Sequence, residues 1–207
     1  MHRLAVMISG SGSNLQAILD AIDAGALDAQ VAIVVSNKSR AYGLERARAA
    51  GIETLVFTAK SYRGTPEWRA RYDADLADKV AAFAPDLVVL AGWMHVLSPA
   101  FLGHCGRRVI NLHPALPGHF AGTHAIQRAF DAFQTGEIEH TGVMVHWVIP
   151  EVDAGDPIAV AQVPIESDDT VESLEKRVHE VEHQLIVQAI QQALQAMDKP
   201  RQAPIGS

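Results

Sequence analysis

Three polar residues in this chain have side chains suited to acyl-type transfer. Asn111 and His113 stand in Asn-Leu-His-Pro, and Asp153 follows later in Val-Asp-Ala-Gly-Asp-Pro. An Asn amide can donate a hydrogen bond to a developing oxyanion, a His can exchange a proton near neutral pH, and an Asp can hold that His and raise its pKa. No nucleophilic Ser or Cys stands beside the His, which favours direct transfer between two bound substrates. The alternative to a catalytic role is that Asn111 is a turn residue and His113 a surface polar group.

A segment rich in Gly and Ser, residues 9–14, follows the first predicted strand and opens the first predicted helix. At such a place backbone N–H groups and the helix dipole attract an anion. No Gly-Lys-Ser/Thr follows, which excludes a Walker A loop, and Leu15 stands where a dinucleotide fingerprint has its third Gly. A terminal monophosphate is therefore the predicted guest. A turn with Ser13 or Asn14 as helix N-cap is the alternative, and the two are compatible.

The elements that would position these residues alternate between buried strands and helices. Apolar, β-branched-rich runs predict strands buried on both faces at 4–8, 31–36, 52–57, 87–91 and 109–112. Helix-like segments lie between them at 14–24, 42–50 and 66–83. This alternation predicts an α/β fold with a doubly wound, mostly parallel sheet.

The pattern changes after His113. A Pro- and Gly-rich loop and a helix near 123–134 precede two predicted strands, 142–149 and 158–164, which would give the sheet an antiparallel C-terminal edge. An Asp or Thr at 168–170 is the predicted N-cap of a long amphipathic helix that runs to about Met197. We expect one domain over residues 1–197 and a flexible tail over 198–207.

Composition limits the classes of protein that the chain can belong to. The net charge of −7 over 207 residues argues against a general nucleic-acid-binding surface. Cys105 is the only cysteine, which excludes an intrachain disulfide and agrees with a reducing cytoplasm. The apolar start is too short for a signal peptide or a membrane span. We therefore expect a soluble, cytoplasmic protein with no nucleic-acid or membrane partner.

Four motifs occur together in one order along the chain. They are Ser-Gly-Ser-Gly-Ser-Asn-Leu-Gln at 9–16, Ala-Gly-Trp-Met-His-Val-Leu-Ser-Pro at 91–99, Asn-Leu-His-Pro at 111–114, and Asp153. In these motifs the sequence resembles the folate-dependent, monofunctional phosphoribosylglycinamide formyltransferases over nearly its whole length. The Asn-x-His and Asp set is shared with methionyl-tRNA formyltransferase and formyltetrahydrofolate deformylase, whereas the glycine-rich opening is particular to this family.

The resemblance implies a reaction and a set of site residues. A formyl group would pass from 10-formyltetrahydrofolate, as co-substrate, to the glycinamide amine of 5-phosphoribosylglycinamide in de novo purine synthesis. No metal is implied, the substrates are small molecules, and the protein is expected to be a monomer or homodimer. The implied catalytic residues are Asn111, His113 and Asp153. The implied phosphoribosylglycinamide-binding residues are Gly12, Ser13, Asn14 and Glu182. The implied formyl-folate-binding residues are Arg69, Met94, His95, Val96, Leu97 and Asn111.

Three features depart from the family pattern. His95 stands where many relatives carry an Arg that meets the folate glutamate tail, which leaves the polyglutamate preference open. Arg69 aligns with a folate-side Arg only across a stretch of unequal length, and Arg63 or Arg71 could take its place. The loop 113–122 is also shorter than the common form.

We expect the Asn111 amide and a protonated His113 to stabilise the oxyanion, with Asp153 keeping His113 charged. His146 is a second candidate for the pocket, and His119 and His124 could help to bind a phosphate or ribose. A zinc site from His113, His119 and His124 would lack a carboxylate or cysteine partner. Two alternatives remain for the function. A deformylase would not need the phosphate loop, and a non-catalytic sugar-phosphate-binding protein would leave the Asn, His and Asp set unexplained.

Overall fold

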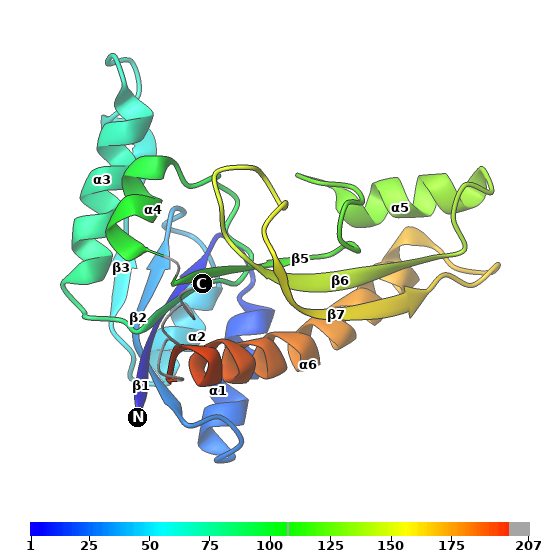
Figure 1. Ribbon diagram of the computed structural model, residues 1–207, viewed down its shortest axis with the longest axis horizontal. Coiled ribbons are helices and arrows are strands. Elements are labelled where there is room, and N and C mark those ends of the chain that lie inside the picture. Colours follow the sequence, from blue (N-terminus) through cyan, green and yellow to red (C-terminus); the bar gives the residue numbers. More distant parts are fainter. Residues whose placement is uncertain (107, 199–207) are drawn as a thin grey trace, which may run out of the picture.

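A seven-stranded sheet organises the fold in the computed structural model, which describes residues 1–106 and 108–198 (Figure 1). The strands are β1 (His2–Ile8), β2 (Ala29–Ser36), β3 (Thr54–Val56), β4 (Leu87–Leu90), β5 (Val109–His113), β6 (His140–Trp147) and β7 (Pro157–Pro164). The helices are α1 (Ser13–Asp23), α2 (Gly43–Ala49), α3 (Trp68–Ala81), α4 (Pro99–Cys105), α5 (Ala125–Gln134) and α6 (Val171–Asp198), with a 3₁₀ turn η1 (Ala59–Ser61).

The strand order is β3-β2-β1-β4-β5-β6-β7. The first five strands of this order pair in parallel, whereas β6 runs antiparallel to both β5 and β7. This confirms the predicted doubly wound, mostly parallel sheet with an antiparallel C-terminal edge. Figure 1 shows β6 and β7 extending away from the parallel strands.

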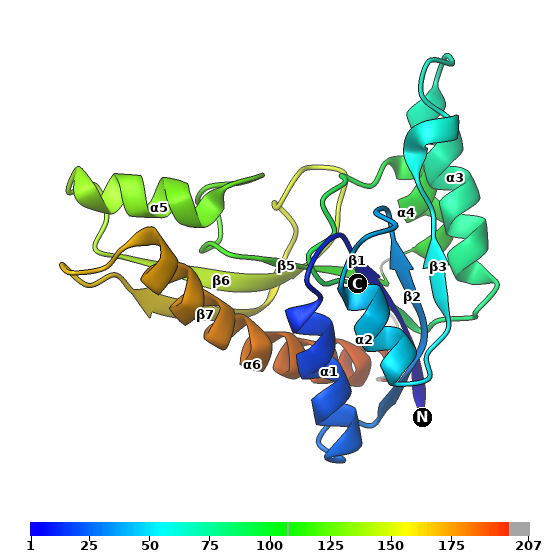
Figure 2. The same ribbon diagram turned by 180° about the vertical axis from the view of Figure 1, so that it is seen from behind.

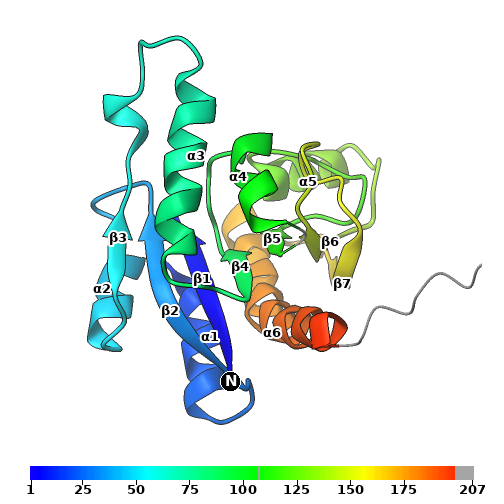
Figure 3. The same ribbon diagram turned by 60° about the vertical axis from the view of Figure 1, so that its left-hand side comes forward.

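Both faces of the parallel part are covered by helices. Along β1, Leu4, Val6 and Ile8 belong to an apolar cluster that includes residues of α1, α2 and α6, while Ala5 and Met7 belong to a second cluster with α3 and α4. Burial on both faces explains why β1 is apolar at successive positions instead of alternately polar. Figure 2 brings α1 and α2 forward, and Figure 3 shows α3 beside α4.

The sequence patterns missed or misplaced some elements. Helix α4 was not predicted, because its seven residues begin with a Pro and include Gly103, which disfavours a helix interior. The helix predicted from residue 66 begins at Trp68, because Glu67 has a left-handed φ of 54°. The strand predicted at 52–57 is reduced to the three residues of β3. Of the predicted tail, Asp198 is the last residue of α6, and 199–207 lie outside the described residues.

Candidate active site

Two adjoining cavities open at the carboxyl ends of the parallel strands, where open α/β sheets bind ligands. The glycine-loop cavity, of about 500 Å³, is lined by 9–14, Lys38 and residues of α5 and α6. The central cavity, of about 460 Å³, is lined by 92–97, by 111–114 and by residues between His146 and Asp153. The residues that line both cavities are Gly92, Met94, Leu112, Pro114, His124 and Ala125. Ligands in the two cavities would therefore meet along a common wall.

The predicted catalytic residues come together in the central cavity. Asn111 and His113 lie at the end of β5 with their side chains on the same face, because successive strand residues alternate. The His113 ring is 4 % exposed, and its Nδ1 lies 3.3 Å from the Asp153 Oδ2. The Asn111 Nδ2 donates to the Asp153 Oδ1 at 3.1 Å. Asp153 also accepts a hydrogen bond from the Gly122 N–H at 2.8 Å, which joins its loop to the loop after β5.

His146 completes this group from β6, directly opposite Asn111 in the antiparallel register. Its Nδ1 lies 2.9 Å from the Trp147 carbonyl oxygen, and its Nε2 lies 3.2 Å from the Asn111 Nδ2 and 3.5 Å from the Asp153 Oδ1. The prediction that His146 lines the pocket is confirmed. The Asn111 amide donates to Asp153 and its Nδ2 also faces the His146 Nε2, so Asn111 must turn a hydrogen away from these neighbours to bind an oxyanion.

Burial and neighbouring charges oppose each other at His113. Burial lowers the pKa of His113 below its ordinary value and outweighs the opposing effect of the Asp153 carboxylate. The net shift therefore favours the neutral imidazole, whereas the sequence led us to expect the charged form. Burial would raise the pKa of Asp153, but hydrogen bonds from His146 and the Gly122 N–H lower it on balance. The pair thus combines an ionised carboxylate with an imidazole that favours its neutral form.

A close pair of glycines shapes the loop before α1. Gly12, the N-cap of α1, has a φ of 71°, and a Cβ added to it would lie 2.5 Å from the Gly43 Cα at the start of α2. The prediction of Ser13 or Asn14 as N-cap is wrong, and no side chain caps α1. N–H groups of the first helical turn have no acceptor within the helix, which suits an anion.

Asn14 and Glu182 meet at the edge of the glycine-loop cavity. The Asn14 Nδ2 donates to the Glu182 Oε2 at 2.9 Å, and the Glu182 residue is only 3 % exposed. His179 places its Nδ1 2.9 Å from the same oxygen. The structure thus brings Gly12, Ser13, Asn14 and Glu182, the predicted phosphoribosylglycinamide-binding residues, to one cavity.

The segment after β4 has two kinds of side chain. Met94 and Val96 are exposed at 62 % and 55 %, whereas Trp93 and Leu97 are buried in the apolar cluster under α3 and α4. Met94, His95, Val96 and Leu97 all line the central cavity, as predicted for a folate slot. Burial, followed by the charges of Arg69 and Arg63, lowers the pKa of His95. His95 thus favours its neutral form.

Arg69 lies behind the wall of the central cavity and does not line it. Its Nε donates to the fully buried Asp73 at 3.2 Å, and its guanidinium donates to the Val96 carbonyl oxygen. Arg63 and Arg69 both lie within cation–π distance of the Trp68 ring. Neither Arg63 nor Arg71 lines the central cavity. Arg69 therefore orients the 94–97 segment in this structure.

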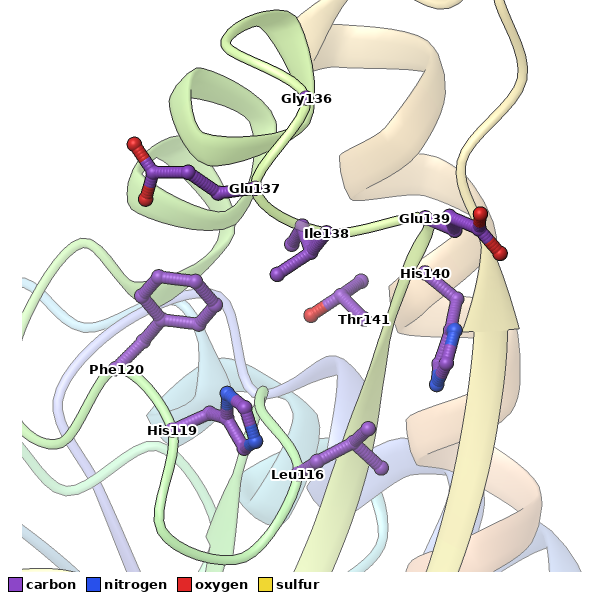
Figure 4. A pocket seen from close by; sticks show the side chains of 9 residues that line it. All are labelled: Leu116, His119, Phe120, Gly136, Glu137, Ile138, Glu139, His140 and Thr141. Carbon is purple, nitrogen blue, oxygen red and sulfur yellow. The ribbon is translucent and has the colours of Figure 1, made fainter.

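His119 and His124, which follow His113 along the chain, line different cavities. His124 lines both the glycine-loop and the central cavity. His119 instead lines a separate cavity of about 430 Å³, together with Phe120 and residues 136–141 (Figure 4). Within the described part of the chain, no group of three or more His, Cys, Asp or Glu side chains is arranged to hold a metal ion. None of the described helices is long and apolar enough to cross a membrane.

Several residues that shape the site were not predicted from the sequence. Lys38 and His179 line the glycine-loop cavity, and Ser9 accepts a hydrogen bond from the Met94 N–H at 2.9 Å. Gly155 lies so close to β6 that a Cβ there would overlap the Trp147 carbonyl oxygen. The glycine-rich run at residues 9–14 was the one local signal for this part of the site. The other residues could not be found locally, because their contacts are distant in sequence.

A doubly wound sheet with two adjoining cavities at its carboxyl edge is the architecture of an α/β enzyme that brings two ligands together. Comparison with known proteins specifies the class. The chain belongs to the formyl transferase family, whose sequence profile matches residues 2–190.

Individual relatives match almost end to end. The phosphoribosylglycinamide formyltransferase of Schizosaccharomyces pombe is 54 % identical over 199 residues, covering 92 % of this chain and 96 % of the relative. That of Escherichia coli is 42 % identical over 180 residues, covering 87 % and 81 %. The crystal structure of phosphoribosylglycinamide formyltransferase from Bacillus halodurans superposes with a TM-score of 0.85 at 34 % identity, covering 95 % and 96 %.

Proposed function

We propose that this chain transfers the formyl group of 10-formyltetrahydrofolate to the amine of 5-phosphoribosylglycinamide, giving formylglycinamide ribonucleotide and tetrahydrofolate in purine (IMP) biosynthesis. The observation that carries this proposal is the common wall between the two cavities, beside which Asn111, His113 and Asp153 lie. Relatives of similar length bear the name of this activity. We place the reaction in the cytoplasm, the reducing compartment that the single cysteine favours.

The glycine-loop cavity suits the phosphorylated acceptor. N–H groups at the start of α1 and the ammonium of Lys38 would bind the phosphate. The Glu182 carboxylate offers acceptors on the α6 side of the same cavity. The amine would then reach the wall formed by Leu112 and Pro114, which also bounds the central cavity.

The central cavity suits the folate donor. Exposed apolar side chains, Met94 and Val96 from one side and Ile149 and Val152 from the other, offer a surface for a flat ring system. A formyl group carried by such a ring would lie near Asn111 at the end of β5.

The chemistry follows from these positions. The acceptor amine attacks the formyl carbon, a carbon–nitrogen bond forms, and the carbonyl oxygen becomes an oxyanion. Asn111 stabilises the oxyanion by turning an amide hydrogen toward it. Neutral His113 takes the proton that the amine loses, and Asp153 stabilises the resulting imidazolium. The bond to the folate nitrogen then breaks, and His113 returns the proton to that nitrogen.

The test is to measure tetrahydrofolate release from 10-formyltetrahydrofolate by the purified protein, with and without phosphoribosylglycinamide. We expect release that requires the amine and produces one formylated acceptor for each folate. Release without the amine would instead identify a deformylase. Binding of either ligand without release would identify a non-catalytic binding protein.

A further inference from the structure

The separate cavity of Figure 4 takes no part in the reaction proposed above. It has a volume of about 430 Å³ and lies between the loop after β5 and the segment that joins α5 to β6. The side chains of Leu116, Phe120 and Ile138 give it apolar walls. Cavities of this size and apolar character are typical of sites for small molecules.

The hydroxyl of Thr141, on β6, points into this cavity (Figure 4). The Thr141 residue is 2 % exposed, and its Oγ1 has no hydrogen-bond partner among the residues that the structure describes. A buried hydroxyl without a partner is costly, because it has lost the hydrogen bonds that water would give it. A ligand with one polar atom at this depth would supply such a bond.

The charges at the rim restrict the class of ligand. Glu137 and Glu139 are exposed, and Figure 4 shows their carboxylates turned away from the interior. Among the described residues no Lys or Arg lines the cavity. Neither an anion nor a cation would therefore find a partner of opposite charge inside. Apolar walls, the Phe120 ring and one inner hydroxyl instead suit an uncharged planar heteroaromatic ring.

The loop after β5 connects this cavity to the catalytic residues. Phe120 lines the separate cavity, and two residues later the Gly122 N–H donates to Asp153 at 2.8 Å. The backbone of Phe120 also raises the pKa of His113, against the larger effect of burial. Phe120 thus presents its side chain to one cavity and its backbone to the imidazole of the other.

The conformation of Phe120 depends on its contacts. Its φ of 46° lies in the left-handed region, which is unfavourable for a residue with a side chain and persists only where the surroundings hold it. Arg128 on α5 supplies part of this support, with its guanidinium 5.6 Å from the ring centroid and a hydrogen bond of 2.8 Å to the Ala121 carbonyl oxygen. A ligand packed against the ring would add to this support.

We propose that the separate cavity binds a small, uncharged heteroaromatic compound, and that this ligand activates formyl transfer by stabilising the loop after β5. The activation rests on the proposed function, whereas the binding does not. The ligand would be a regulator and not a substrate, because no residue that lines this cavity also lines the central or the glycine-loop cavity.

Benzimidazole is a suitable probe, because it is planar and carries both a ring N–H and an acceptor nitrogen. NMR measures its binding at about pH 8, where an imidazole is ordinarily neutral, with tetrahydrofolate present to occupy the central cavity. Thr141→Val keeps the shape of the side chain and removes the hydroxyl, whereas Thr141→Ser keeps the hydroxyl. We expect Thr141→Val to weaken binding about tenfold, the size of one hydrogen bond to a buried group, and Thr141→Ser to retain it.

Thr54→Val is the matched control, because Thr54 lies on β3 and lines none of the three cavities. Equal binding by Thr141→Val and the unsubstituted protein would overturn the proposal, as would the absence of saturable binding. Benzimidazole-5-carboxylate has the same ring with a negative charge, and should bind about threefold more weakly. Equal or tighter binding of the carboxylate would refute an uncharged ligand.

Steady-state kinetics tests the activation. With both substrates saturating, benzimidazole should raise the kcat of the unsubstituted protein and of Thr54→Val about fivefold, the lower end of typical coupling between two sites. The same concentration should have little effect on Thr141→Val. Saturation of the cavity without a rise in kcat would overturn the activation.

Failure of the proposed function looks different, because the unsubstituted protein would then transfer no formyl group with or without benzimidazole. The contact between the two cavities is then read from an NMR titration of His113. Its midpoint should rise when benzimidazole is bound, because the Phe120 backbone that raises the pKa of His113 is held in place. An unchanged midpoint would refute the coupling.

Discussion

The two cavities each contain a histidine beside a carboxylate, yet the pKa values of these histidines move in opposite directions. In the central cavity His113 is 4 % exposed, and burial lowers its pKa despite Asp153 at 3.3 Å. In the glycine-loop cavity the His179 side chain is 50 % exposed, and Glu182 at 2.9 Å raises its pKa. A carboxylate neighbour therefore does not by itself make a histidine a cation, because the loss of hydration can outweigh it.

The lowered pKa of His113 matches the work proposed for the central cavity. Proton exchange needs an imidazole that can be neutral in the resting protein and charged in the transition state. The surrounding walls differ as well, since helix ends form much of the glycine-loop cavity, whereas loops after β4, β5 and β6 form the central one.

The largest effect is expected from removing the imidazole of the central cavity. His113→Ala should lower kcat roughly 10²- to 10³-fold, as for other losses of a preorganised transition-state partner, while both KM values change little. Steady-state kinetics with each substrate varied in turn measures this. His119→Ala is the control, because His119 lines the separate cavity of Figure 4. Near-normal turnover of His113→Ala at saturating substrates would disprove its role in proton transfer.

A second test changes the shape of the glycine-loop cavity and leaves the central cavity intact. Gly12→Ala places a Cβ at a φ of 71° and 2.5 Å from the Gly43 backbone, so the loop must shift. We expect the acceptor KM to rise about tenfold and the free energy of unfolding to fall by about 2 kcal/mol, with the donor KM unchanged.

Gly103→Ala, in α4 and outside both cavities, is the control for this change. A Cβ at Gly103 would meet no atom within 4 Å, so the kinetics of this variant should remain close to those of the unsubstituted protein. Equal behaviour of the two variants would show that the glycine contact does not shape the cavity.

A smaller effect is expected from the apolar wall of the central cavity. Ile149→Ser removes part of an exposed apolar surface that a folate ring would cover, and should raise the donor KM roughly threefold while the acceptor KM stays constant. Val160→Ser, an equally exposed change on β7 outside both cavities, serves as the control. A larger change in acceptor KM than in donor KM would contradict the assignment of the two cavities.

The finest test compares the two histidines through pH. Because the pKa of His113 is lowered and its neutral form is the proposed base, the acid limb of kcat/KM for the donor should lie below about pH 6.5, the ordinary value for histidine. An NMR titration of His179, whose pKa is raised, should instead place its midpoint above that value. An acid limb above the ordinary value would mean that the active form of His113 is the cation.

The alternation of strands and helices along the chain, and the grouping of Asn111, His113 and Asp153 as candidate catalytic residues, were accessible from the sequence. Apolar runs in Leu4–Ile8 and Leu87–Ala91 indicated strands buried on both faces, and Asn111 with His113 at the end of such a run predicted side chains at the carboxyl edge. The positions of Asn14 and Glu182 in one cavity came from the family resemblance, since nothing local joins α1 to α6.

Other features could not be predicted because they depend on burial that only the folded chain defines. The direction of the His113 pKa follows from the burial of its side chain, and spacing alone suggested the opposite. The positions of His179 and Lys38 in the glycine-loop cavity also needed the three-dimensional arrangement, because each lies on an element with many polar residues. Likewise, Arg69 was predicted to bind the folate but contacts Asp73 and Val96.

The hydrogen bond from the Met94 N–H to the Ser9 hydroxyl has a thermodynamic consequence. It joins the loop after β1, which lines the glycine-loop cavity, to the loop after β4, which lines both cavities. A ligand that binds in one cavity and strengthens this bond changes the free energy of ligand binding in the other cavity. By reciprocity, the second ligand must then change the affinity for the first by the same factor. Ser9 would in that way make the two substrates heterotropic effectors of each other, in addition to their direct contact during the transfer.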